Sequence, residues 1–327
     1  MARYFITGFS GFVSGYFLEY LEKADERSKV LGIDHIYPDY GTNYKNIDVV
    51  FEKTDLLNSD KVKALLINFQ PDYVIHLASL SSVSYSWKNP AKSFINNTNI
   101  FLNLLEIIRL NNISCRLLSI GSSEEYGNVV AEDLPLRETK ELVPISPYAV
   151  ARVSQEMLSK IYHKGYGLDI VITRSFNHIG PRQKDIFVVS SFAKQIINIK
   201  NSGKDKGILT CGDVDIIRDF LDVRDVVKAY HLLLGKGKKG EVYNVCSSNG
   251  YTLKDIIEKM GKITELNIEI RRDKNLVRVL DNRMIVGNNE KLKKDTGWNN
   301  NIDIDESLTD ILDYWNTKIH EDSKVAL

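Results

Sequence analysis

The chain has 327 residues, which is long enough for one or two domains with a large hydrophobic core. Its basic and acidic residues number 43 each, so its charge gives no reason to expect nucleic acid or an anionic membrane as a partner. The three cysteines, Cys115, Cys211 and Cys246, are widely spaced, which argues against a disulfide framework and a zinc site. The sequence has no signal-peptide core and no apolar run of ~18 residues. Together these features predict a cytoplasmic protein.

Strand and helix patterns alternate through the first half of the chain. Buried strands are predicted at 3–7 (RYFIT), 29–34 (KVLGID), 49–53 (VVFEK), 72–78 (DYVIHLA), 115–122 (CRLLSIGS) and 168–176 (LDIVITRSF). Helices are predicted at 12–23, 59–69, 90–110 and 146–167. Strands that alternate with helices of about ten or more residues predict an α/β fold with a doubly wound parallel sheet, the Rossmann arrangement.

The pattern loosens beyond about Phe176. Short strands, helices and loops rich in Gly, Lys and Asn follow, such as KNSGKDKG and GKGKKG. They predict a smaller α/β lobe that interleaves with the sheet. We expect an NAD-binding Rossmann domain at 1–175, to which 212–235 returns, and a substrate-binding lobe at 176–327.

The stretch TGFSGFVSG lies where the first strand turns into the first helix. Gly8 permits the tight turn, and Gly11 lets backbone N–H groups approach a diphosphate at the helix N-terminus, where the helix dipole favours anions. The expected contacts with a dinucleotide are Gly8, Ser10, Gly11, Phe12 and Val13. A plain strand–helix turn is the alternative interpretation.

An acidic residue, Asp34, ends the second predicted strand, 23 residues after the second of those glycines. A carboxylate there accepts hydrogen bonds from the adenosine ribose and repels a 2′-phosphate, which favours NAD over NADP. Asp55 and Leu56 follow the third strand and are expected near the adenine. Leu77 and Ala78 end the fourth strand and are expected beside the same cofactor. A solvated loop carboxylate is the alternative for Asp34.

The stretch SPYAVAR places Tyr148 and Arg152 one helical turn apart. A phenol needs about 4 kcal/mol of stabilisation of its phenolate to transfer protons near pH 7. One cation about 6 Å away, at an effective dielectric of about 20, supplies about 3 kcal/mol, so Arg152 and an oxidised nicotinamide together would suffice. Ser122 ends the fifth strand, at the carboxyl edge of the sheet where such folds bind ligands. Alternatively, Tyr148 and Arg152 form an ordinary pair on a helix surface.

Motifs recur along nearly the whole chain. They are TGxxGxxx at the N-terminus, HLAS, GSSEEYG, a YxxxR helix, FNHIGPRQ, FVVSSFAKQI, RDFLDVRDVVKAY and YNVCSSNGYTL. The first four resemble the extended short-chain dehydrogenases/reductases, the NAD-dependent epimerase/dehydratase family. Together with the others they look like its GDP-sugar branch, nearest to the GDP-6-deoxy-D-mannose (rhamnose) reductases, with the GDP-mannose 4,6-dehydratases next. The resemblance implies NAD as cofactor and a GDP-sugar as substrate.

The resemblance also implies catalytic roles. Ser122 would bind the sugar oxygen at the carbon that gains or loses a hydride, and Tyr148 would be the general acid/base on that oxygen. Arg152 stands where the family has a lysine that bridges the nicotinamide ribose; the charge is kept, but the longer, planar side chain changes the geometry. Glu124 stands where the dehydratases keep a second base.

For the substrate, the resemblance implies contacts from the C-terminal half of the chain. Asn177 in FNH and Arg218 in RDF stand where the family binds the diphosphate. Arg278 and Asp281 in RVLD weakly echo a family segment that closes over the nucleotide. The remaining expected substrate contacts are Ser123, Arg182 and Lys194.

Three functions stay open at this point. The first is an NAD(H)-dependent oxidoreductase at C4 of a GDP-activated hexose or heptose, in the bacterial-type biosynthesis of capsule or lipopolysaccharide sugars. The second is a 4,6-dehydratase or C4 epimerase with tightly bound NAD. The third is a non-catalytic nucleotide-sugar binding protein, made inert by Arg152. No metal is expected, because His76 and His178 have no partners at ligand spacing.

The helices predicted at 90–110 and 146–167 carry apolar residues beyond one stripe. These residues are Phe101, Leu104, Leu105, Ile108, Val150, Met157 and Ile161. Such helices can bury one face on the sheet and the other on a partner. The resemblance implies a four-helix contact between subunits, and we expect a homodimer or a dimer of dimers.

Overall fold

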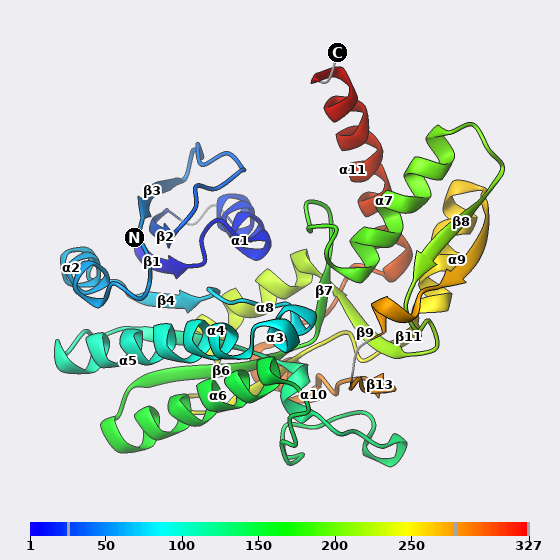
Figure 1. The fold of residues 1–327 in the computed structure, drawn as a ribbon. Helices are drawn as coiled ribbons and strands as arrows, with labels where there is room; N and C mark the ends of the chain where they lie inside the picture. Colours follow the sequence, from blue (N-terminus) through cyan, green and yellow to red (C-terminus); the bar gives the residue numbers. More distant parts are fainter. Residues whose placement is uncertain (25–26, 278–279, 326–327) are drawn as a thin grey trace.

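The computed structural model describes residues 1–24, 27–277 and 280–325. Its centre is a seven-stranded sheet whose neighbouring strands are all parallel, in the order β10-β6-β5-β4-β1-β2-β3 (Figure 1). The strands are β1 (Ala2–Thr7), β2 (Ser28–Asp34), β3 (Ile47–Lys53), β4 (Tyr73–His76), β5 (Arg116–Ser122), β6 (Asp169–Ser175) and β10 (Val242–Val245). The strand order reverses between β1 and β4, which is where such sheets bind ligands. The predicted α/β Rossmann sheet is confirmed.

Helices cover both faces of this sheet. On one face lie α2 (Ser59–Phe69), α5 (Ile100–Leu110) and α6 (Pro147–Tyr166), and on the other lie α1 (Phe12–Lys23), α8 (Val223–Lys236) and α10 (Glu290–Thr296). Phe5 and Ile6 are adjacent in β1 but belong to different hydrophobic cores, one on each face. This explains why the predicted strands read as continuous apolar runs rather than as alternating ones.

The helix predicted at 90–110 forms one continuous helical segment that contains a π-helical turn. It consists of α4 (Pro90–Phe94), a π-helical turn η1 (Ile95–Asn99) and α5. The short helix α3 (Val83–Lys88), which the sequence did not predict, precedes it. Asn97, inside the π-turn, is fully buried and binds the loop after β4, because its Oδ1 accepts from Leu80 N at 2.8 Å.

The lobe forms around a second core that includes Phe192, Ile257 and Trp315. Its helices are α7 (Val188–Asn201), α9 (Leu253–Thr264) and α11 (Ile304–Val325). Its strands are β7 (Asn177–Ile179), β8 (Lys206–Cys211), β9 (Ile217–Asp222), β11 (Gly250–Thr252), β12 (Asn267–Arg272) and β13 (Met284–Ile285). Strand β9 pairs with β7, β11 and β13, and β8 pairs with β12. The 3₁₀ turns are η2 (Ser123–Tyr126), η3 (Ala131–Asp133) and η4 (Lys274–Leu276).

The chain crosses between the two parts more than once. After β6 it forms β7 to β9 in the lobe, and it then returns with α8, which packs on α1 and β5. It next adds β10 to the edge of the main sheet, with Val242 opposite Ile172 of β6. The segment packed on the main sheet thus reaches beyond 235, where the sequence placed its end. Within the described ranges, no helix combines the length and the apolar character needed to cross a membrane.

The apolar residues proposed for a subunit contact divide into two groups. Phe101, Leu104, Leu105 and Ile108 are buried within the protomer, at 2% exposure or less, because α5 lies between α2 and α6 on the sheet. These four residues therefore belong to the helix face that packs inside the protomer. Val150, Met157 and Ile161, in contrast, form an exposed stripe along α6, at 43%, 40% and 59% exposure.

Candidate active site

The glycine loop lies at the carboxyl end of β1, next to the point where the strand order reverses. Gly8 has a φ of +70°, and a Cβ there would lie 2.6 Å from the backbone N of Ala78. Gly11 is the N-cap of α1, and no side chain caps this helix end, so the N–H groups of its first turn, beginning at Phe12 and Val13, remain available to a ligand. The loop therefore fits close approach by an anionic group such as a diphosphate.

Asp34 ends β2 and holds the glycine loop from the side. Its Oδ2 accepts from the backbone N–H of Ser10 at 3.0 Å, and its Oδ1 accepts from the N–H of His35 at 2.7 Å. The carboxylate is only 11% exposed. It is therefore fixed in place beside the loop and is not a solvated surface acid.

The ends of β3 and β4 complete this side of the site. Asp55 closes a local turn, since its Oδ1 accepts from Leu57 N at 2.9 Å, and Leu56 lies within the same turn. Leu77 N donates to Thr7 O at 3.1 Å, which places Leu77 and Ala78 directly against the end of β1. The structure thus brings Gly8, Leu77 and Ala78 together, as predicted.

Tyr148 and Arg152 are both buried at the start of α6, with 6% and 4% exposure. Ser146 caps the helix by accepting from Ala149 N, and Pro147 occupies its first position, which fixes where the helix begins. The Arg152 Nε donates to the Tyr148 hydroxyl at 3.2 Å. The guanidinium carbon lies 5.3 Å from the centre of the tyrosine ring. The predicted pair is therefore a buried contact rather than a surface pair.

Arg152 also connects this pair to Ser122. Its Nη1 donates to the carbonyl of Ile120 at 3.1 Å, two residues before Ser122 on β5. The Ser122 Oγ accepts from Glu124 N at 3.2 Å, so this hydroxyl caps the short turn η2. Ser122, Tyr148 and Arg152 therefore lie at one edge of the sheet, where α6 packs against β5 and η2.

His76, at the end of β4, faces the same charge from within the sheet. Its Nδ1 lies 2.9 Å from Thr7 Oγ1, and its Nε2 is buried with no hydrogen-bond partner among the described residues. Burial, and then the charge of Arg152, lower the pKa of His76 to about 3. The imidazole is therefore neutral at physiological pH and adds no charge beside Arg152.

Three of the predicted substrate contacts gather around strand β9. The Asn177 Nδ2 donates to Asp219 O at 3.2 Å. Arg218 is 5% exposed and donates to Asp281 Oδ1 at 2.5 Å and to the Asn282 carbonyl at 2.9 Å. The structure thus places Asn177 and Arg218 on neighbouring strands of one small sheet and Asp281 beside Arg218, although their positions in the chain are far apart.

The other predicted substrate contacts lie apart from this group. Arg182 stacks 4.0 Å above the ring of Tyr16 and pairs with Glu19 at 2.8 Å, so it is bound to α1. Lys194 pairs with Asp185 at 2.6 Å. In the described part of the chain, neither cation has a hydrogen bond or an ion pair with the β9 group. Ser123 is buried in η2 beside Glu124, and Arg278 lies outside the described residues.

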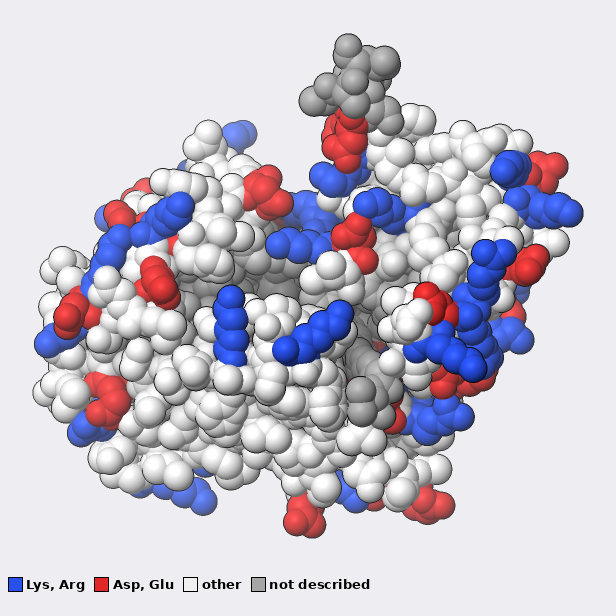
Figure 2. Space-filling view, viewed as in Figure 1, with Lys and Arg blue, Asp and Glu red and all other residues white. Residues whose placement is uncertain are grey.

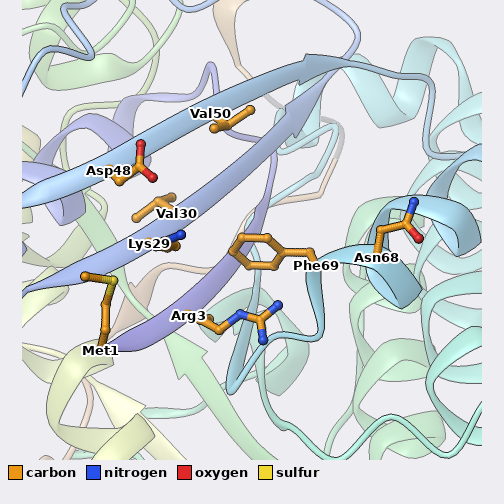
Figure 3. A pocket seen from close by; sticks show the side chains of 8 residues that line it. All are labelled: Met1, Arg3, Lys29, Val30, Asp48, Val50, Asn68 and Phe69. Carbon is orange, nitrogen blue, oxygen red and sulfur yellow. The ribbon is translucent and has the colours of Figure 1, made fainter.

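The surface is hollowed between the N-terminal body and the lobe, and Lys and Arg side chains lie in and around this hollow (Figure 2). A separate hollow of ≈ 540 Å³ lies at the amino ends of β1 to β3. It is lined by Arg3, Asp48 and Phe69 among others (Figure 3), and the Arg3 guanidinium lies 5.1 Å from the centre of the Phe69 ring. Gly8 is at the opposite end of β1, so that hollow is not part of the site.

Two buried polar residues at the site were not predicted. Gln155 binds the Arg152 guanidinium, with its Oε1 2.5 Å from Nη1. Glu125 holds the backbone of Ser122 in place, since its Oε1 accepts from Ser122 N at 2.6 Å. The signal for Gln155 was present: it lies one turn after Arg152 on the buried side of the helix. Glu125 gave no such signal, because its partner is a backbone group.

Together, the doubly wound sheet, the glycine loop at its switch point and the Ser–Tyr–Arg edge define a protein of the short-chain dehydrogenase/reductase class. The family model for GDP-mannose 4,6-dehydratase matches residues 5–311. The chain therefore belongs to this family, as the sequence motifs predicted.

Individual relatives agree with this placement. The GDP-6-deoxy-D-mannose reductase of Pseudomonas aeruginosa is 36% identical over 320 residues, covering 98% of this chain and 99% of the relative. The GDP-mannose 4,6-dehydratase of Yersinia enterocolitica is 27% identical over 281 residues, covering 82% and 74%. Among solved structures, RMD from Pseudomonas aeruginosa complexed with NADPH has a TM-score of 0.83 at 33% identity, covering 97% and 100%. The UDP-glucose 4-epimerase of Thermus thermophilus complexed with NAD has a TM-score of 0.82 at 26% identity, covering 96% and 98%.

Proposed function

We propose that the chain is an NAD(H)-dependent oxidoreductase that interconverts hydroxyl and keto at C4 of a GDP-activated hexose or heptose. The observation that carries this proposal is the buried Tyr148–Arg152 contact at the same sheet edge as Ser122. A GDP-6-deoxy-D-mannose reductase is 36% identical to this chain over almost the full length of both, which supports reduction or oxidation over dehydration.

The residues of the glycine loop fit a nicotinamide dinucleotide. Gly8, with a φ of +70°, forms the tight turn between β1 and α1 and packs against the backbone of Ala78, and the uncapped start of α1 offers N–H groups to the diphosphate. Asp34 favours NAD, because a fixed carboxylate beside the loop repels a 2′-phosphate. The NADPH in the solved RMD structure belongs to that protein, and the fixed carboxylate of Asp34 is the observation in this chain that supports NAD.

The reaction then divides among the chain's own residues. When bound, the nicotinamide supplies or accepts the hydride. Ser122 orients the C4 oxygen by a hydrogen bond, and Tyr148 donates a proton to that oxygen during reduction or removes it during oxidation. Arg152 stabilises the phenolate that forms at Tyr148 when the proton leaves. Solvent restores the proton after reduction.

The GDP-sugar would bind to the lobe. In this proposal residues 1–175, with 212–235, hold the cofactor, and 176–327 hold the sugar nucleotide. Asn177 and Arg218 would bind the diphosphate, and Ser123, Arg182 and Lys194 are the further substrate contacts in this proposal. Asp281 occupies the Arg218 guanidinium in the structure, so diphosphate binding requires this carboxylate to exchange for phosphate oxygens.

A 4,6-dehydratase or C4 epimerase with tightly bound NAD is the second candidate. The observation in its favour is Glu124, whose backbone N–H is bonded to the Ser122 hydroxyl, so that a carboxylate follows the serine closely. A dehydratase needs such a second base. A non-catalytic binding protein is disfavoured, because Arg152 donates a hydrogen bond to the Tyr148 hydroxyl, so an arginine at this position keeps its contact with the proton-transfer group.

The exposed stripe on α6 supports a homodimer or a dimer of dimers. Val150, Met157 and Ile161 repeat at helical spacing on the outer face of this helix. Two copies of the stripe would bury each other around a two-fold axis. We also propose a cytoplasmic location, in keeping with three free cysteines, and a role in bacterial-type surface-glycan sugar biosynthesis.

The test is a direct assay of the purified protein. GDP-4-keto-6-deoxymannose and NADH are supplied, and the reduced-nicotinamide absorbance is followed while the product is separated. Loss of absorbance with formation of a 6-deoxyhexose nucleotide supports the proposal. Conversion of GDP-mannose to a 4-keto product without added cofactor, together with no reaction of the keto sugar, would identify the dehydratase instead.

A further inference from the structure

Gln155 is buried between α6 and β5, at 1% exposure. Its Nε2 donates to Ser119 Oγ and to Ile120 O, both at 3.0 Å, so the amide is fixed to the strand. Its Oε1 faces the Arg152 guanidinium at 2.5 Å. A polar side chain that is fully buried and uses both ends of its amide has a defined orientation.

The hydrogen bonds of Arg152 can be assigned nitrogen by nitrogen. The Nη1 donates to Gln155 Oε1 and to Ile120 O, and the Nε donates to the Tyr148 hydroxyl. Within the described ranges Nη2 makes no hydrogen bond. The guanidinium is planar, so fixing Nη1 on the strand side fixes the direction of Nε and Nη2 as well.

We propose that Gln155 is a positioning residue that holds the arginine at position 152 in the one orientation in which Nε meets the tyrosine hydroxyl and Nη2 has no hydrogen-bond partner among the described residues. This inference rests on the proposed function. The family lysine has one compact ammonium and needs no such anchor, whereas a guanidinium can rotate away from the tyrosine unless one of its ends is held. Gln155 thus supplies the anchor that the guanidinium at position 152 needs.

A lysine at 152 would leave the anchor without its partner. Its single ammonium cannot reach the tyrosine hydroxyl and also replace both Nη1 bonds, so Gln155 Oε1 would become a buried acceptor without a donor. The two residues should therefore be energetically coupled. The other titratable groups that face Arg152, His76 and Tyr230, are neutral, because burial lowers the pKa of the first and raises that of the second.

The experiment is a double-mutant cycle with Gln155→Met and Arg152→Lys. In the wild-type background, Gln155→Met should lower kcat about tenfold and raise the Kd for NADH severalfold, because the guanidinium loses its anchor. In the Arg152→Lys background, the same change should alter both quantities less than twofold. Equal effects in the two backgrounds would show that Gln155 only supports packing, and would overturn the proposal.

A matched control and a charge variant sharpen the result. Ser159 bonds Ser119 and the Gln155 carbonyl in the same buried seam without touching Arg152, so Ser159→Ala should lower stability and leave kcat unchanged. Gln155→Glu keeps an acceptor oxygen but places a negative charge beside the guanidinium, which offsets its positive charge and destabilises the Tyr148 phenolate. The pH–rate profile should therefore move to higher pH; an unmoved profile would count against the proposal. NADH affinity is measured in every variant, so the cycle is still readable if the sugar substrate proves to be a different one.

Discussion

At the residue scale, the central feature is an arginine in a place where its relatives by motif carry a lysine. The structure shows that the positive charge is delivered to the tyrosine hydroxyl through Nε, the nitrogen nearest the backbone, rather than through the end of the side chain. Arginine is therefore compatible with proton transfer here, because the contact atom lies partway along the side chain and the rest extends past it.

The first prediction concerns the proton itself. Tyr148→Phe should lower kcat by about 10²–10⁴ and change NADH affinity less than twofold, because only the hydroxyl that carries the proton is lost. Steady-state kinetics and NADH fluorescence titration measure the two quantities. Full activity in this variant would mean that the proton goes elsewhere, with Glu124 the next residue to test.

The second prediction concerns the charge. Arg152→Met removes the cation that touches the hydroxyl, so the phenolate is less stable and the residual activity should require higher pH, by about one unit or more. The pH dependence of kcat/KM measures this shift. A profile that keeps its wild-type position would show that Arg152 is a structural contact only.

The third prediction concerns the cofactor. NAD(H) should bind at least about tenfold more tightly than NADP(H), which corresponds to about 1.4 kcal/mol. Asp34→Asn should narrow this ratio, since the amide oxygen still accepts from Ser10 but carries no charge. Asp48→Asn, an exposed acid at the other edge of the sheet, serves as the control and should leave the ratio unchanged. Calorimetry with both dinucleotides decides the matter; equal affinities in the wild type would refute the assignment.

At the element scale, most of the first 175 residues could be predicted because their signals are local. The helix bounds at Phe12–Lys23, Ser59–Phe69 and Pro147–Tyr166 follow from glycines, caps and a proline that lie in the same stretch of sequence. The π-turn between α4 and α5 could not be predicted, because its cause is Asn97 bonding to a loop 17 residues earlier. Arg182 was likewise predicted as a substrate contact from its motif alone. Its contact with Tyr16 joins residues far apart in the chain, so no local pattern predicts it.

The fourth prediction tests the glycine turn between β1 and α1. Gly8→Ala should lower the free energy of unfolding by about 1–3 kcal/mol and abolish tight cofactor binding, because φ is +70° and the new Cβ would meet backbone atoms of Ala78. Gly165→Ala, near the end of α6, should instead add up to about 1 kcal/mol, because a Cβ there meets nothing within 4 Å among the described residues outside its own helical turn. Urea unfolding of both variants measures the contrast. Similar losses in the two would show that the turn is not strained by a side chain.

At the scale of the whole molecule, a buried ionic network joins α6 to β6 beside the site. Glu156 on α6 accepts from Arg174 at 2.9 and 2.8 Å and from Lys160 at 2.7 Å, and Glu125 lies beside it. Burial and the nearby Glu156 carboxylate raise the pKa of Glu125 well above its usual range. Glu125 therefore keeps its proton in the folded protein, where the unfolded chain would release it.

The fifth prediction follows from the sign of that shift. The folded state holds a proton that the unfolded state loses above about pH 4.5, so the Glu125 contribution to the free energy of unfolding falls as pH rises, by about 1.4 kcal/mol per unit until its folded pKa is reached. Glu125→Gln keeps the bond to Ser122 N and cannot ionise. The variant should therefore gain stability relative to wild type as the pH rises above about 4.5, as measured by urea unfolding. Parallel curves for the two proteins would show that Glu125 is ionised in the fold.

The interleaving of the two parts was foreseen only in outline. The alternating pattern predicted the sheet and a return to it, but not that the returning segment supplies a strand as well as a helix. VYNV in β10 is short and follows a loop, so nothing local distinguishes it from a strand of the lobe. The expectation that Asn177, Arg218 and Asp281 bind one substrate came from motif resemblance alone. Their proximity depends on pairing between β7, β9 and β13, which no local pattern predicts.

The late arrival of β10 also has a consequence for how the protein is made. A ribosome releases β1 to β6 first, and the outer edge of β6 then has no neighbour until Val245 has emerged. The face of the nascent sheet that α8 will cover stays bare until α8 has emerged at Lys236, with Leu118, Ile120 and Val171 exposed. A fragment ending at residue 175 should therefore aggregate through that open edge rather than fold alone. The N-terminal half thus depends on the chain reaching the lobe and coming back before it is complete.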